Sequence, residues 1–314
     1  MNPIKILLTA SNGFIGSYLG AHLKNKFTVT SISKSEQIDK GDYISVDLSV
    51  LAGVRNFVDN SQKFDTLIFL VGLAHKKGKG QEIDEFRRIN KQTLVNLLSA
   101  LEEQKKLPNK IIFASTISVY GEKLHQNMYN EESNKNPFSP YALTKLEAEE
   151  FLLEHYGKQS WILRFAPVYA PDFQLNINRR TKAAGRYYKV GKGSKKLSLC
   201  NLENIGLAVQ GILEDKVPSG IYNISDEIEY SYNELLKYVN AKWVVRIPTF
   251  LVKGLYVVGK MMNNIFLKEN ATKLISDNIF PSDKIRQFID MPNTLDSKST
   301  NNNQQDEQKN SIVK

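Results

Sequence analysis

The sequence predicts an α/β protein with a doubly wound parallel sheet and a smaller C-terminal domain. Short apolar segments alternate with helical patterns up to residue 165, and a glycine turn joins the first segment to the first helix. After residue 166 this alternation stops and the chain becomes strongly basic. We therefore expect a first domain over residues 1–166, a second mainly over 167–292 with segments near 200–224 returning to the first, and a disordered tail over 293–314.

The bulk composition is that of a globular protein in a reducing compartment. Of the 314 residues, 41% are hydrophobic and 24% are charged, as in an ordinary folded domain. The single cysteine, Cys200, excludes an intramolecular disulfide. Because no uninterrupted apolar run is long enough for a signal segment or a bilayer span, we expect a cytoplasmic protein without a membrane span.

Residues 247–268 form a run with many apolar side chains. Lys253, Lys260 and two asparagines interrupt it. Since a membrane-spanning helix needs about 20 mostly apolar residues, we expect a packed helix here in preference to a membrane anchor.

A strand, a glycine turn and a helix open the chain. Residues 4–9 are apolar, the stretch from Ala10 to Gly16 follows, and apolar residues then recur with helical spacing. This order is typical of dinucleotide-binding domains of the Rossmann type, in which glycines let the backbone approach the pyrophosphate at a helix N-terminus. Ala10 stands where the first glycine is expected.

The end of the second strand, expected over residues 27–34, bears on the choice of cofactor. NAD-specific sites have an acidic residue there for the ribose hydroxyls, whereas the 2′-phosphate of NADP requires a cation. This chain has Ser33, Lys34 and Ser35, with Glu36 only later. The pattern favours NADP, with NAD possible, and an ordinary loop is the alternative interpretation.

Further strands and a long helix complete the predicted first domain. The strands are expected over residues 43–46, 66–72, 110–115 and 160–165, with one more over 221–224, and the helix over 83–103. Thr116 follows one of these strands, and a hydroxyl at the carboxyl end of a parallel strand is well placed to face a ligand. A polar strand end without a ligand is the alternative.

Another helix is expected to begin at Ser139, a good N-cap, with Pro140 in the first helical position. Tyr141 then lies in the first turn and Lys145 one turn later on the same face. A helix N-terminus and a nearby ammonium both favour the phenolate, so we expect the pKa of Tyr141 to fall and its phenol to act as an acid or base. A surface pair on an amphipathic helix is the alternative.

The positive charge of the chain is concentrated in one segment. Residues 173–202 contain eight lysines and arginines and no acidic residue, against a net charge of +9 for the chain. These eight are Arg179, Arg180, Lys182, Arg186, Lys189, Lys192, Lys195 and Lys196. We expect a site for a small phosphorylated ligand. A solvated face, a membrane surface and nucleic acid are alternatives, although only Tyr187 and Tyr188 supply the aromatic side chains that nucleic-acid binding prefers.

Four motifs in this order carry a family resemblance. They span residues 10–16, 115–121 (STISVYG), 141–145 (YALTK) and 164–169 (RFAPVY). With them the chain resembles the extended short-chain dehydrogenase/reductases over roughly residues 4–290, and more narrowly the NAD-dependent epimerase/dehydratase family acting on nucleotide sugars. Residues 72–75 and 136–141 are most similar to the branch that reduces or epimerises carbon 4 of UDP-linked sugars in surface-polysaccharide assembly.

The resemblance implies a role for each matching residue. The catalytic residues would be Tyr141, Lys145 and Thr116. The cofactor would contact Asn12, Gly13, Phe14, Ile15, Gly16, Ser33, Lys34, Asp47, Leu48, Leu70, Gly72, Tyr141, Lys145 and Val168. The substrate would contact Ser118, Asn176, Arg179, Lys195 and Lys196. The basic C-terminal domain would hold the nucleotide sugar, and the protein would be a homodimer.

The chain departs from the family pattern on the substrate side. Leu197 occupies a position where the family often has an arginine for the nucleotide diphosphate, so Lys195 or Lys196 would supply the charge. Family dehydratases have an Asp-Glu pair after the threonine, whereas Ile117 and Ser118 follow Thr116 here, which disfavours dehydration.

The expected activity is therefore a UDP-sugar 4-ketoreductase or 4-epimerase. The alternative from another class is a non-catalytic NAD(P)-binding sensor or interaction protein of the same fold. No metal site is expected, because His75 has no partner at a recognisable metal-ligand spacing.

Overall fold

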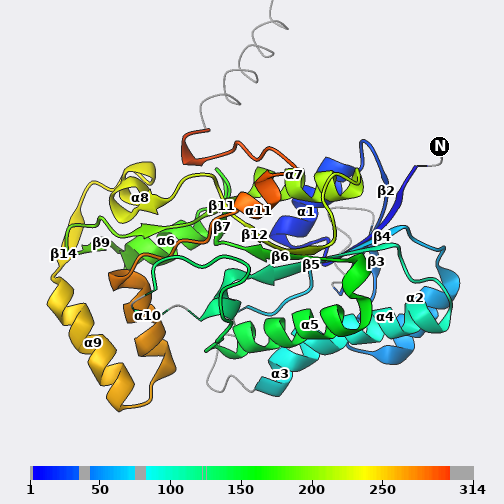
Figure 1. Ribbon diagram of the computed structural model, residues 1–314, viewed down its shortest axis with the longest axis horizontal. Helices are drawn as coiled ribbons and strands as arrows, with labels where there is room; N and C mark the ends of the chain where they lie inside the picture. Colours follow the sequence, from blue (N-terminus) through cyan, green and yellow to red (C-terminus); the bar gives the residue numbers. More distant parts are fainter. Residues whose placement is uncertain (1–2, 35–42, 75–82, 122, 125, 298–314) are drawn as a thin grey trace, which may run out of the picture.

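The structure is a computed structural model that describes residues 3–34, 43–74, 83–121, 123–124 and 126–297 (Figure 1). Ser35, Glu36, His75 and residues 298–314 of the expected tail lie outside the described residues. No helix in the described part of the chain has the length and apolar character needed to cross a membrane.

A seven-stranded parallel sheet forms the centre of the molecule, which confirms the predicted doubly wound fold. Its strands in spatial order are β12 (Gly220–Ile224), β6 (Ser160–Phe165), β5 (Lys110–Thr116), β4 (Thr66–Phe69), β1 (Lys5–Thr9), β2 (Thr28–Ser33) and β3 (Tyr43–Ser45). The order reverses direction at β1, so the carboxyl ends of β1 and β4 diverge into a crevice where doubly wound folds bind their ligands.

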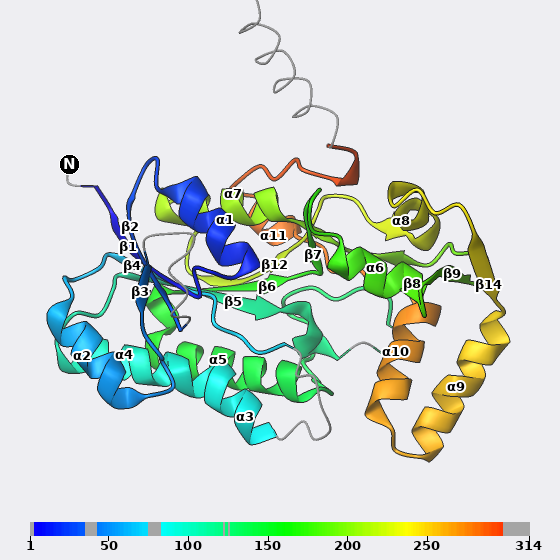
Figure 2. The same cartoon turned by 180° about the vertical axis from the view of Figure 1, so that it is seen from behind.

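Helices cover both faces of the sheet (Figures 1 and 2). One layer contains α1 (Phe14–Leu23), α7 (Leu202–Leu213) and α11 (Asp283–Arg286); the other contains α2 (Leu51–Asn60), α3 (Ile83–Arg87), α4 (Thr93–Glu103) and α5 (Pro140–Tyr156). Successive strand residues point to opposite faces. Thus Ile6 and Leu8 belong to the core under α1 and α7, whereas Leu7 belongs to the core under α2 and α4.

The segment expected to form one helix over 83–103 is interrupted. A π-helical turn, Arg88–Gln92, lies between α3 and α4. Such a turn accommodates one extra residue and often occurs at functional sites. Here it places the buried side chain of Asn90 toward α5, where its Nδ2 donates to Thr144 Oγ1 at 2.9 Å.

The C-terminal part of the chain builds a lobe at one end of the sheet (Figure 1). Its elements are β7 (Val168–Tyr169), α6 (Leu175–Thr181), β8 (Lys182–Ala183), β9 (Arg186–Val190), β10 (Lys196–Leu197), β11 (Cys200–Asn201), β13 (Tyr230–Ser231), α8 (Tyr232–Tyr238), β14 (Val244–Ile247), α9 (Thr249–Met261) and α10 (Ile265–Ile275). Residues 247–268, expected as one packed helix, instead contribute to two helices that fold back as a hairpin (Figure 2).

The first residues of the expected tail pack against the body of the protein. Asn293 exchanges hydrogen bonds with the buried side chain of Asn204, and Leu295 is buried with its backbone N–H donating to Tyr230. Asn293 and Leu295 therefore contact the body of the protein.

A buried ion pair lies beneath the carboxyl ends of β5 and β6. Arg164 Nη2 is 2.6 Å from Glu149 Oε2, and both side chains are almost completely buried. Ser115 also donates to Glu149, and Tyr120 accepts a hydrogen bond from Arg164 at 3.0 Å. Because each charge is balanced and hydrogen-bonded, the pair ties α5 to two neighbouring strands.

We predict that Arg164→Met lowers the free energy of unfolding by about 3–5 kcal/mol, because Glu149 would be left as an unpaired buried charge. Arg55→Ala is the matched control, since Arg55 and Glu103 form an ion pair with both side chains about half exposed; its effect on stability should be small, because solvent screens exposed pairs. Urea unfolding of the three proteins measures both values. Equal effects of the two substitutions would contradict the prediction.

Candidate active site

The predicted site residues lie where the parallel strands end. The glycine turn follows β1, Ser33 and Lys34 end β2, Leu70 and Gly72 follow β4, and Thr116 ends β5. Carboxyl ends of parallel strands meet at one edge of a sheet. The structure therefore brings the predicted cofactor and catalytic residues to a common edge.

The glycine turn is closed too tightly for side chains. A Cβ on Gly16 would lie 2.2 Å from the carbonyl oxygen of Ala10, and one on Gly13 would lie 3.2 Å from the same atom. Ala10 has φ 51°, in the left-handed region that favours glycine, which explains why the pattern expects glycine there. Gly13 is the N-cap of α1 and provides no side-chain cap. The first N–H groups of α1 thus remain available to an anion such as a pyrophosphate.

Residues at the ends of β2 and β3 continue the candidate cofactor site from the glycine turn along the sheet edge. Ser33 Oγ donates to Asn12 Oδ1 at 2.5 Å, and Lys34 Nζ is 2.9 Å from Asp47 Oδ2. Although partial burial raises the pKa of Asp47, hydrogen bonds from Lys34 and Ser49 lower it overall to about 2. Asp47 is therefore ionised at neutral pH and neutralises part of the positive charge of Lys34.

Leu48 and Phe14 are fixed by contacts of their own. Leu48 is buried, and its carbonyl accepts a hydrogen bond from Asn96. The ring of Phe14, at the start of α1, stacks on Phe173 with ring centroids 3.8 Å apart. This contact joins the glycine turn to the beginning of the C-terminal lobe.

The ammonium group of Lys145 is buried between three elements. Its Nζ donates to the carbonyl oxygens of Ala114 at 2.8 Å and Val71 at 3.1 Å. A Cβ on Gly72 would lie 3.2 Å from Nζ, so the glycine permits this close approach. Desolvation lowers the pKa of Lys145 to about 7, against the opposing effect of the Glu149 carboxylate.

Tyr141 and Thr116 form the predicted catalytic pair. Ser139 Oγ accepts from the N–H of Ala142, so it caps α5 as expected. The phenol of Tyr141 is hydrogen-bonded to the Thr116 side chain, yet burial raises its pKa to about 12. The expected fall of this pKa is therefore wrong, because loss of water around the phenol outweighs the hydrogen bond. Tyr141 is protonated at neutral pH and can act as a proton donor.

Sequence reasoning missed two residues that position this group. Asn90 Oδ1 accepts from the N–H of Leu73 at 2.6 Å, which holds the segment after β4 against the π-helical turn. Glu149, on the same face of α5 as Lys145, is bound by Arg164. The signal for Asn90 was present, since it is a polar residue between Phe86 and Leu94 on the apolar side of the predicted helix.

The predicted substrate residues lie around α6, β7 and β10. Ser118 is half-buried beside Thr116, whose Oγ1 donates to Ser118 Oγ at 3.3 Å. Asn176 Nδ2 donates to the carbonyl of Val168, and Arg179 lies in the last turn of α6. Ser118 therefore lies just after β5, whereas Asn176 and Arg179 both lie on α6, which comes after β6 and β7.

Lys195 and Lys196 are paired with acidic residues from other parts of the chain. Lys195 Nζ lies 3.2 Å from Asp277, and Lys196 Nζ lies 3.5 Å from Glu229. Leu197, at the position of the family arginine, is buried in the lobe core. The basic segment is thus less strongly positive in the fold than along the sequence.

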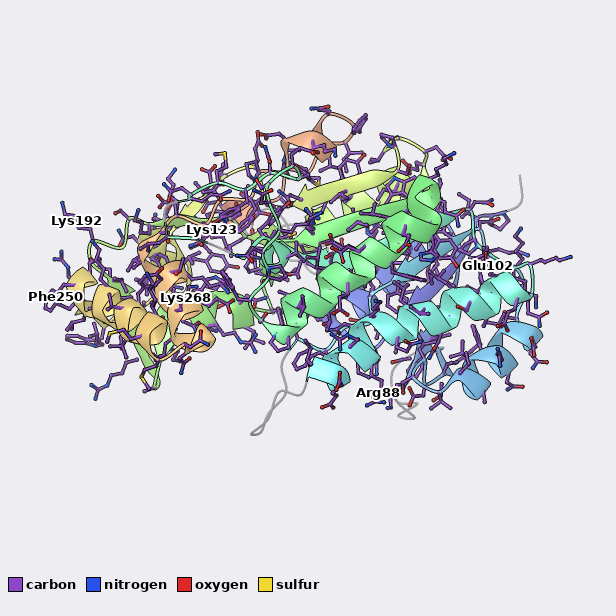
Figure 3. The ribbon with its side chains drawn as sticks, turned by 60° about the horizontal axis from the view of Figure 1, so that its bottom comes forward. Arg88, Glu102, Lys123, Lys192, Phe250 and Lys268 are labelled. Carbon is purple, nitrogen blue, oxygen red and sulfur yellow. The ribbon has the colours of Figure 1, made fainter. Side chains whose placement is uncertain are left out.

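A cavity of about 480 Å³ lies between the α9–α10 hairpin and the segment that leads into α5. Its lining residues are Lys123, Leu124, Gln126, Asn136, Phe138, Tyr256, Lys268 and Thr272. Lys123 and Lys268 both lie near the junction of the hairpin and the body (Figure 3). Lys268 Nζ is 4.8 Å from the centroid of the Phe138 ring.

We predict that Gly16→Ala weakens binding of the nicotinamide dinucleotide at least about tenfold, because the new methyl group cannot occupy a point 2.2 Å from a carbonyl oxygen. Gly20→Ala, in the same helix, is the control, since its Cβ would make an ordinary contact 3.6 Å from Leu8. Fluorescence titration with NADPH and NADH measures the affinities, and circular dichroism checks the fold. Similar affinities for the two variants would contradict this description of the turn.

Comparison with known proteins points to a single family. The model of the NAD dependent epimerase/dehydratase family matches residues 6–224. The chain is 26% identical over 256 residues to an N-acetyl-α-D-glucosaminyl-diphospho-ditrans,octacis-undecaprenol 4-epimerase of Escherichia coli O157:H7, covering 78% of this chain and 74% of the relative. It is 32% identical over 198 residues to an uncharacterized UDP-glucose epimerase of Bacillus subtilis, covering 54% of this chain and 58% of the relative.

A solved structure shares the fold. The UDP-Glc/GlcNAc 4-epimerase of Campylobacter jejuni superposes with a TM-score of 0.70 at 20% identity, covering 93% of this chain and 94% of that chain.

Proposed function

Because this chain belongs to the NAD dependent epimerase/dehydratase family of enzymes, we propose that it is a UDP-sugar 4-ketoreductase or 4-epimerase of surface-polysaccharide biosynthesis. The observation that carries the proposal is the Tyr141–Thr116 hydrogen bond, one helical turn from the buried ammonium of Lys145. The sensor alternative offers no reason for an acid, a hydrogen-bonding hydroxyl and a cation to share one sheet edge.

The dinucleotide fits the residues present, because the glycine turn leaves room for backbone contact and α1 has an uncapped N-terminus. When bound, the nicotinamide would supply or accept the hydride. Tyr141, protonated at neutral pH, would give its proton to the sugar oxygen during reduction. Thr116 would hydrogen-bond the same oxygen, and Lys145 would hold the cofactor ribose while stabilising the phenolate that remains.

The residues after Thr116 favour reduction or epimerisation over dehydration. Ile117 is buried in the core, and Ser118 donates its N–H to Thr116 Oγ1. Neither side chain can act as the carboxylic acid or carboxylate that elimination of water requires. We therefore propose a reaction confined to hydride and proton transfer at one ring carbon.

For the substrate we propose a UDP-linked sugar. Its contacts would be Ser118, Asn176, Arg179, Lys195 and Lys196. The two relatives described above carry names with a nucleotide-linked and a polyprenyl-linked sugar, and both classes present a diphosphate joined to a sugar. The ion pairs of Lys195 and Lys196 are partly exposed, and we propose that they open for such a diphosphate.

We also propose that the cofactor and the substrate are bound mainly by different domains. Residues 1–166, with segments near 200–224, would hold the cofactor, and residues 167–292 would hold most of the sugar nucleotide. The pairing of β12 with β6 and the packing of α7 beside α1 support the return of the later segments. The protein would be a homodimer through its two long helices.

Tyr141→Phe should lower turnover by about 10²–10⁴-fold and leave cofactor affinity nearly unchanged, because it removes one hydroxyl and keeps the ring. The assay is a panel of UDP-sugars and polyprenyl-diphosphate sugars with NAD, NADH, NADP or NADPH. Net consumption of reduced cofactor identifies a reductase, and product without consumption identifies an epimerase. Unchanged turnover of the variant would refute the role of Tyr141.

For the cofactor we propose NADP in preference to NAD. The side chain of Lys34 is 67% exposed and that of Asp47 31% exposed, so their ion pair is worth at most about 1 kcal/mol and can rearrange toward a 2′-phosphate. Lys34→Ala should then weaken NADPH binding about five- to tenfold and leave NADH binding nearly unchanged. Calorimetry measures the four affinities. Equal affinity for both cofactors, with no effect of the substitution, would establish that Lys34 does not bind the 2′-phosphate of NADP.

A further inference from the structure

Helix α9 is apolar on two opposite sides. On one side Val252 and Gly259 are buried, and Val252 belongs to a small core with Ala271 of α10. A Cβ on Gly259 would lie 2.9 Å from the backbone nitrogen of Lys268, so the two helices are tightly packed along this line. The hairpin thus uses one face of α9 for its own stability.

The opposite side of α9 is exposed. Phe250 has 70% and Met261 81% of its surface accessible. The seven exposed apolar residues, here called the α9 face, are Phe250, Leu251, Leu255, Val257, Val258, Met261 and Met262. At about 100° per residue they lie within roughly half of the helix circumference, turned away from the packed side.

The neighbouring strand and the residue before it also expose apolar side chains. Val244 and Val245 of β14 are exposed, and Trp243, just before it, is 87% accessible. Strand β14 and helix α9 follow one another at the outer end of the C-terminal lobe (Figures 1 and 2). Contiguous exposed apolar patches such as the α9 face mark interaction sites in soluble proteins.

The stretch that contains β14 and α9 carries positive charge and no negative charge. Residues 235–268, which include β14 and α9, contain six cations: Lys237, Lys242, Arg246, Lys253, Lys260 and Lys268. Strand β9 pairs with β14, and Lys189 is in register with Arg246. The β9 part of the acid-free segment 173–202 is thereby brought beside β14, and Lys192 and Phe250 both lie at the tip of the lobe (Figure 3).

The positive charge and the exposed apolar area around α9 together favour one kind of binding partner over the others. A second copy of this surface would bring two sets of like charges together. Nucleic acid would satisfy the cations but leave the α9 face in water. An anionic lipid surface satisfies both, because apolar side chains enter the boundary of headgroups and acyl chains while cations meet the phosphates.

We propose that α9 and β14 form a docking surface for an anionic phospholipid bilayer. With 13 residues, α9 is about 20 Å long, shorter than the ~30 Å hydrocarbon core, so it lies along the surface and does not span it. The cavity described above borders the same hairpin through Tyr256 and Lys268, so docking brings its lining beside the lipid headgroups. This proposal rests on the surface alone and is independent of the proposed reaction.

Vesicle flotation of the full chain tests the proposal. The protein should float with vesicles of phosphatidylcholine and phosphatidylglycerol, less with phosphatidylcholine alone, and less again at high salt. Phe250→Ser combined with Met261→Ser should lower the partition coefficient at least about tenfold. Met128→Ser with Ile228→Ser removes two exposed apolar side chains elsewhere and should have no effect.

Tryptophan emission gives a second measurement that needs no variant. Trp243 is exposed whereas Trp161 is buried, so binding to phosphatidylglycerol vesicles should shift the emission to shorter wavelength. Absence of flotation and of an emission shift would overturn the proposal, as would equal losses in the two double variants. Self-association in sedimentation that the Phe250 and Met261 substitutions abolish, without lipid binding, would assign the surface to a second copy and also overturn it.

Discussion

The candidate active site depends on the hydrogen bonds of the buried ammonium group of Lys145. This group joins α5 to the backbone at the ends of β4 and β5 through the carbonyls of Val71 and Ala114. Hydrogen bonds of this kind are strong when water is excluded, and they fix three elements relative to one another. Tyr141 lies one turn earlier on α5, so these hydrogen bonds also fix its position relative to Thr116.

Burial also sets the protonation of the two groups in opposite directions. The same loss of water that lowers the pKa of Lys145 to about 7 raises that of Tyr141 to about 12. The proton therefore resides on the phenol, while the amine titrates near neutrality. The Glu149 carboxylate is bound by Arg164, and its negative charge opposes the fall in the pKa of Lys145.

Local features of the site were predictable from sequence, and long-range ones were not. The cap at Ser139, the Tyr141–Lys145 spacing and the glycine turn are encoded within a few residues, and the parallel sheet followed from the alternation of patterns. The pKa of Tyr141 was mispredicted because burial cannot be read from its neighbours in the chain. Asp277 and Glu229, which pair with Lys195 and Lys196, come from distant segments. Likewise, periodicity cannot tell which apolar side of α9 is covered.

The π-helical turn at Arg88–Gln92 makes the candidate active site depend on the number of residues in this helical segment. The one additional residue in this turn rotates the helical residues that follow it by about 100° relative to their positions in a regular helix. Asn90, which lies within this turn, is hydrogen-bonded to Leu73 and Thr144. The position of the sheet edge relative to α5 therefore depends on the number of residues between Phe86 and Leu94. An insertion or deletion in this segment would change that position, whereas most single substitutions would leave it intact.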